Sequence, residues 1–151
     1  MRFSVLGSGF WVLVLSSWFF VLSCVVSAQN PQALLNRAVD QFEKRQFAES
    51  ARTFDELAKI IPDEAPQLWQ RGIALYYAGR VDDALAQFRR SLDINPKHAQ
   101  TLFNLGIVKR DARNDAKGAI ETWEQLLASV PDYPDAGKVR TMIAELKTRT
   151  S

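Results

Sequence analysis

A repeat with a period of about 34 residues runs through most of this chain and limits what the chain can fold into. Prolines recur once in each period, at Pro62, Pro96 and Pro131. A leucine, two small residues and an aromatic ring keep the same period: Leu34, Ala38, Ser50 and Phe54, then Leu68, Gly72, Ala84 and Phe88, then Leu102, Gly106, Ala119 and Trp123. Such a period is typical of helical hairpins that stack because none can bury its apolar face alone.

These five recurring positions resemble the tetratricopeptide repeat, a unit of about 34 residues that forms two helices. The resemblance covers three copies, which we place at residues 31–64, 65–98 and 99–133. It implies an all-α fold, a right-handed α-solenoid of helix-turn-helix hairpins. A C-terminal capping helix and tail over residues 134–151 would bring the total to about seven helices.

Apolar spacing and the prolines set the expected helix boundaries. The first helix of each unit is predicted over residues 32–44, 65–78 and 99–112, and the second over 48–60, 82–94 and 116–129. A last helix over residues 135–148 places one apolar face toward the array: Ala136, Val139, Ile143 and Leu146.

The turns inside the hairpins carry residues that suit helix ends. Gly79 suits the reversal after a first helix, while Asp82, and Asn114 and Asp115 in the third unit, suit the starts of the second helices. The third unit has one extra residue between Gly106 and Ala119, so its turn over residues 113–117 is expected to be looser.

The segment from Met1 to Ala28 has the pattern of a targeting sequence. No charged residue occurs from Phe3 to Ala28, and the apolar run ends in small side chains at the exit. This pattern predicts a secretory signal peptide cleaved after Ala28. Two alternatives stay open, because the stretch is long enough to be a membrane anchor, and its Val-Leu-Ser-Cys segment resembles a lipoprotein box with Cys24 as the lipidated residue. Each alternative predicts an exported protein, periplasmic or secreted, that meets a membrane only through this segment.

Charge and composition exclude several functions. Lys and Arg number 19 and Asp and Glu 17, a balance that disfavours nucleic acid as a partner. One cysteine excludes an internal disulfide, and one histidine excludes a multi-histidine metal centre. Phosphate loops, nucleophile elbows and metal-ligand spacings are missing from the sequence. We therefore expect no catalytic residues, no metal and no cofactor, and we expect His98 to be a solvated turn residue.

The resemblance implies which residues would face a ligand. In tetratricopeptide folds the first helices line the concave side, and this groove usually holds an extended peptide or a partner helix. In the second unit the inward residues share one helical face. The predicted groove residues are Leu35, Val39, Phe42, Trp69, Ile73, Tyr76, Tyr77, Phe103, Ile107 and Arg110.

These residues favour a protein or peptide partner with apolar side chains. Family members that clamp the C-terminal carboxylate of chaperones carry Lys and Asn where this chain has Leu35 and Val39, so that class of ligand is disfavoured. We therefore expect a non-catalytic scaffold or adaptor.

Two other functions stand as alternatives. Residues 118–120 and 123–127, with Val139, Arg140 and Ile143, resemble the repeat portion of bacterial c-type cytochrome maturation factors, which present apocytochrome tails to a haem lyase. A small enzyme built on the array is the alternative of another class, and the missing catalytic constellation argues against it.

Overall fold

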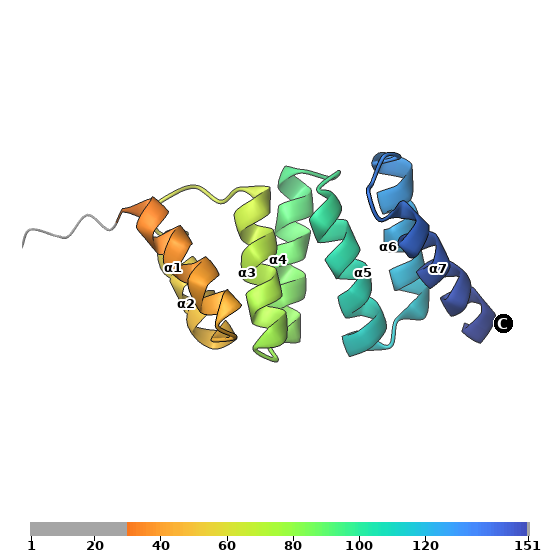
Figure 1. Cartoon of the computed structure of the whole chain (residues 1–151), viewed down its shortest axis with the longest axis horizontal. Helices are drawn as coiled ribbons and strands as arrows, with labels where there is room; N and C mark the ends of the chain where they lie inside the picture. Colours follow the sequence, from red (N-terminus) through yellow and green to blue (C-terminus); the bar gives the residue numbers. More distant parts are fainter. Residues whose placement is uncertain (1–29, 151) are drawn as a thin grey trace, which may run out of the picture. The chain divides into compact units, whose positions relative to one another are not determined.

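A computed structural model describes residues 30–150, without the side chain of Thr150, and residues 31–151 form one compact unit. The predicted signal peptide, its cleavage site and Cys24 lie outside the described residues. The described part contains seven helices and no strand (Figure 1): α1 (Pro31–Glu43), α2 (Phe47–Leu57), α3 (Ala65–Tyr77), α4 (Val81–Ile94), α5 (Ala99–Arg113), α6 (Ala116–Ser129) and α7 (Ala136–Thr150).

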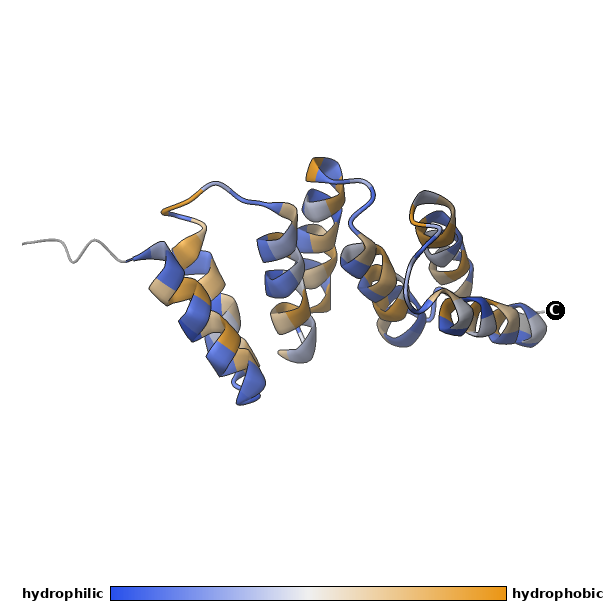
Figure 2. Cartoon of the chain, turned by 45° about the horizontal axis from the view of Figure 1, so that its top comes forward, coloured by the Kyte–Doolittle hydropathy of each residue, from blue (hydrophilic) through white to orange (hydrophobic). Residues whose placement is uncertain are grey.

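The helices form three hairpins that stack in chain order. Within each hairpin α1 packs on α2, α3 on α4, and α5 on α6, and the second helix of each hairpin packs on the next helix along the chain. Apolar and polar residues alternate around the helices, as in amphipathic helices that bury one face (Figure 2). The all-α solenoid predicted from the repeat is confirmed, with helix boundaries mostly close to those expected.

A small residue against an aromatic ring sets the spacing inside two of the hairpins. A Cβ atom at Gly72 would lie 2.5 Å from Cε1 of Phe88, and one at Gly106 would overlap Nε1 of Trp123. Phe88 and Trp123 are fully buried, and the Trp123 indole N–H donates to the Phe103 carbonyl at 3.0 Å. The absence of a side chain at Gly72 and Gly106 therefore allows the Phe88 and Trp123 rings to pack against the helix backbone.

The turn inside each hairpin contains one residue in the left-handed conformation. Gly79 has φ of 80°, as the sequence predicted, and Arg45 and Asn114 occupy the equivalent places with φ of 61° and 51°. Glycine adopts this conformation freely and asparagine tolerates it. Arginine pays a steric cost there, so the first turn is the strained one.

The third hairpin departs from two expectations. Its turn is not looser, because the extra residue extends α5 to Arg113 and leaves only Asn114 and Asp115 before α6. Asp115 caps α6 as predicted, accepting from the Gly118 backbone N–H at 2.8 Å. Asp82 is not a cap, because α4 begins one residue before it and its carboxylate pairs with Arg113.

Substituting Gly72, with Gly137 as a control, tests the aromatic contact. Gly72→Ala should lower the free energy of unfolding by about 1–3 kcal/mol, because the new methyl overlaps the Phe88 ring. Gly137→Ala is the matched control, since nothing lies within 4 Å of its added Cβ. Urea unfolding followed by circular dichroism measures both, and equal stability of the two variants would contradict this packing.

Replacing the strained arginine should stabilise the protein. Arg45→Gly is expected to raise the free energy of unfolding by about 0.5–1 kcal/mol, because relief of the left-handed strain exceeds the entropy cost of glycine. Gly79→Ala should shift the melting temperature in the opposite direction. A loss of stability in Arg45→Gly would mean that the conformation carries little strain.

Candidate functional site

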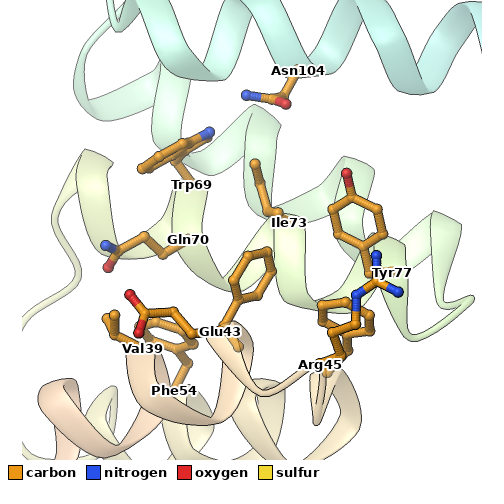
Figure 3. A pocket seen from close by; sticks show the side chains of 11 residues that line it. Val39, Glu43, Arg45, Phe54, Trp69, Gln70, Ile73, Tyr77 and Asn104 are labelled. Carbon is orange, nitrogen blue, oxygen red and sulfur yellow. The ribbon is translucent and has the colours of Figure 1, made fainter.

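A mostly apolar opening lies between the first two hairpins. It has a volume of about 580 Å³. Five of the predicted groove residues line it, on α1 and α3: Val39, Phe42, Trp69, Ile73 and Tyr77. Figure 3 shows Val39 of α1 and the labelled side chains of α3 around this opening, with Asn104 of α5 on the side opposite α1. We call this opening the α1–α3 pocket.

Three aromatic rings form one end of the α1–α3 pocket. The Phe42 ring meets Phe47 edge-on at 5.2 Å and Tyr77 at 5.9 Å, and Phe47 stacks on Tyr77 at 5.0 Å. The Tyr77 side chain remains 58% exposed, although large aromatic residues are usually mostly buried. An aromatic surface that is held rigid and left open is suited to binding another apolar group.

Two predicted groove residues of α1 and α3 do not line this pocket. Leu35 is half-buried and packs on a cluster that includes Leu34, Ala38 and Phe54. Tyr76 is half-buried beside Tyr77, at 5.3 Å between ring centroids. Burial and the Asp111 carboxylate raise the pKa of the Tyr76 hydroxyl, so Tyr76 faces the charged side of the array.

The predicted residues of α5 are covered by the C-terminal part of the chain. Phe103 and Ile107 are half-buried in a cluster that also holds Met142 of α7 and Tyr133. The Tyr133 ring lies 6.1 Å from Phe103, and the Lys138 ammonium lies 5.8 Å from the same ring. The structure therefore does not bring these two residues into the α1–α3 pocket.

Arg110 belongs to a separate, charged opening of about 630 Å³ at the ends of α5 and α7. Its guanidinium donates two hydrogen bonds to Asp111, at 2.5 and 2.9 Å, and stands 5.4 Å from the Trp123 ring. The hydrogen bond from Arg110 lowers the pKa of the Asp111 carboxyl. Residues 30–150 contain no group of three or more His, Cys, Asp or Glu that could hold a metal ion.

Sequence reasoning missed six lining residues of the α1–α3 pocket: Glu43, Arg45, Phe47, Phe54, Gln70 and Asn104. The repeat itself held a signal for one of them, because Glu43 stands one full period before Tyr77 and so occupies the equivalent place. Phe54 follows the repeat, which predicts only a role in packing. Arg45 lies in the turn and Phe47 is the first residue of α2, and at both places helical periodicity gives little guidance.

His98 lies beside Trp69, a lining residue of the α1–α3 pocket. Its Nδ1 caps α5 by accepting from the Thr101 backbone N–H at 3.3 Å, and its ring lies 6.1 Å from the ring of Trp69. The expectation of a solvated turn residue is therefore wrong, because His98 is half-buried. Burial lowers the pKa of His98 below its ordinary value of 6.5, and the cap requires the neutral ring because only that form has an acceptor at Nδ1.

Comparison with known proteins shows a similarity to one repeat family over part of the chain. Residues 70–134 match the family model of the tetratricopeptide repeat. Protein CTR9 homolog of Arabidopsis thaliana is 30% identical over 107 residues, and Protein SGT1 homolog of Bos taurus is 29% identical over 103 residues. These matches cover 70% and 66% of this chain but only 10% and 30% of the two relatives. The chain thus spans a small part of the curated relatives it matches.

Solved structures share the fold at low sequence identity. The type III secretion chaperone SycD of Yersinia enterocolitica, in complex with a peptide of the translocator YopD, superposes with a TM-score of 0.73. The match covers 80% of this chain and 94% of that one at 13% identity. At this identity the likeness shows the tetratricopeptide fold alone.

The cap at His98 predicts a pH-dependent stability. Because folding lowers the pKa of His98, the unfolded chain binds a proton more readily, and the free energy of unfolding should fall as pH drops through 6.5. His98→Asn keeps a capping acceptor that does not titrate. Thermal melts at about pH 7.5 and about pH 5 should show a larger drop for the wild-type protein than for the variant. Identical pH dependence in both would refute the role of His98.

Proposed function

We propose that this tetratricopeptide repeat protein is a non-catalytic scaffold or adaptor that binds an apolar peptide or partner helix in the α1–α3 pocket. The observation that carries the proposal is the open aromatic cluster of Phe42, Phe47 and Tyr77 beside Trp69 and Ile73. Tryptophan and tyrosine in a concave apolar site are the residues that most often dominate binding energy.

The size and lining of the pocket suit a peptide. Its volume of about 580 Å³ falls within the range of about 300–1,000 Å³ that is usual for sites that bury most of a ligand. Gln70 and Asn104 add amide groups that can bond to a peptide backbone. The SycD structure, which has the same fold, holds a peptide of YopD.

The same lining supports binding over catalysis. Catalytic carboxylates are usually desolvated so that their pKa values shift toward the working pH. Glu43, the carboxylate of the α1–α3 pocket, is exposed at the rim. A small enzyme built on the array would need a reactive constellation that these residues do not form.

We propose that the protein is exported and acts in the periplasm or outside the cell. The proposal rests on the uncharged segment from Phe3 to Ala28 and its small-residue exit. In the described part of the chain, no helix is both long and apolar enough to cross a bilayer. N-terminal sequencing of the secreted protein should begin at Gln29, whereas lipidation at Cys24 or an intact Met1 would favour a membrane anchor.

A role in c-type cytochrome maturation is a second proposal with weaker support. Most of the residues that carry that resemblance, including Trp123, Leu126, Val139 and Ile143, are buried in the core of the third hairpin and α7. These buried residues therefore reflect helix packing, and they give no evidence for a particular ligand. A peptide with a Cys-x-x-Cys-His segment tests the idea directly, and absence of binding would remove it.

Removing aromatic groups of the pocket should weaken peptide binding while the fold persists. Against short peptides selected from a random display library, Tyr77→Ala and Trp69→Ala should each weaken binding by about 2–4 kcal/mol, because they remove central apolar anchors. Ile94→Ala is the matched control, since Ile94 is 53% exposed but lies outside the pocket. Fluorescence anisotropy measures the affinities. Selected peptides that bind all three variants equally would place the site elsewhere.

A further inference from the structure

Two opposite charges at the rim of the α1–α3 pocket form no ion pair within the described part of the chain. Glu43 and Arg45 both line the pocket, and both are exposed. Among residues 30–150 neither joins any of the ion pairs, whereas Lys44, between them in the chain, pairs with Asp40 at 2.8 Å. Lys44, which does not line the pocket, is thus neutralised by Asp40. Glu43 and Arg45, which line it, form no ion pair among the described residues.

The backbone of Arg45 gives a second, independent reason to consider this rim functional. Arg45 has φ of 61°, and the equivalent turns of the other hairpins use Gly79 and Asn114 for the same conformation. A long side chain in a left-handed turn costs stability. Strained residues often mark binding sites, and here the strained residue places its guanidinium beside the pocket.

The two charges lie at different ends of the opening. In Figure 3 the Glu43 carboxylate is on the side of Val39 and Gln70, while the Arg45 guanidinium is on the side of Tyr77. The apolar wall formed by Ile73 and the aromatic rings lies between them. A ligand that crosses the pocket therefore meets a negative charge at one end and a positive charge at the other.

We infer that the partner segment is a short apolar stretch flanked by one basic and one acidic residue, with the basic residue at Glu43 and the acidic residue at Arg45. This inference rests on the proposed function, because it names the chemistry of the peptide that the α1–α3 pocket would bind. The apolar side chains supply most of the affinity through burial. The flanking charges select among apolar segments and fix the direction in which the segment lies.

A panel of three fluorescent peptides tests the charge rule. All three share a central Phe-Ala-Phe-Ala-Phe segment, and they differ only in their flanking residues: Lys and Glu, two Lys, or two Glu. The full-length protein should prefer the mixed peptide over each of the others by about two- to fivefold, as expected for exposed ion pairs. The preference should shrink as salt is added, because exposed charges are screened.

Charge reversal at the rim should redirect this preference. Glu43→Lys makes both ends positive and should bind the two-Glu peptide best, while Arg45→Glu makes both ends negative and should bind the two-Lys peptide best. The double variant should prefer the mixed peptide again. Because each peptide can bind in either direction, this pattern does not depend on the orientation of its backbone.

Matched variants separate local recognition from net charge. Lys44→Glu changes the net charge by the same amount as Arg45→Glu, and Glu49→Lys matches Glu43→Lys, yet neither Lys44 nor Glu49 lines the pocket. Both controls should keep the wild-type preference, and circular dichroism checks that every variant is folded.

The outcomes distinguish this inference from the proposed function. If the peptides bind and Tyr77→Ala abolishes binding, but charge reversal leaves the order of preference unchanged, the charge rule is wrong and the pocket assignment stands. If none of the three peptides binds in a manner that depends on Tyr77, the proposed function falls and the charge rule falls with it.

Discussion

The close contact between a glycine and an aromatic ring is the interaction on which this array depends. Gly72 lets the Phe88 ring lie directly on the backbone of α3, and Gly106 does the same for Trp123 on α5. Both rings are removed from water entirely, which gives the large apolar stabilisation that such side chains contribute. The contact also fixes the distance between the two helices of a hairpin. Each hairpin then presents an apolar face of fixed shape, and the next hairpin can stack on it.

The α1–α3 pocket is a consequence of that stacking. Because the units repeat at a constant period, side chains one period apart come to equivalent places on the inner helices, as Val39 and Ile73 do. At the third unit the equivalent residue, Ile107, packs on a cluster that residues of α7 also join, and it does not line the pocket. α7 thus packs on α6 and shares a cluster with two residues of the predicted groove. What stays open is the part beside α1, where Tyr77 is exposed.

In the first turn, the residue whose backbone conformation costs stability, Arg45, also lines the proposed binding pocket. The left-handed conformation of Arg45 opposes folding, while its side chain places a positive charge at the rim of an apolar pocket. The other two turns, at Gly79 and Asn114, carry residues that suit the backbone and do not line the α1–α3 pocket. A local loss of stability beside a binding surface is a common compromise in proteins. The backbone strain at Arg45 and one charged edge of the pocket therefore both lie in the turn between α1 and α2.

Periodicity and local backbone preference were enough to predict the three hairpins, most helix boundaries, the position of Gly79 and the cap at Asp115. The resemblance to the tetratricopeptide repeat implied that Val39, Phe42, Trp69, Ile73 and Tyr77 share a groove, and the structure brings these five together in one pocket. Long-range packing, in contrast, placed Phe103 and Ile107 in a cluster with α7, placed Arg110 over the Trp123 ring, and brought Glu43 and Arg45 to the pocket. Helical periodicity predicts which face of its helix a residue occupies. It does not state which neighbouring helix covers that face, nor where a turn directs its side chains, because both depend on contacts between residues far apart in the chain.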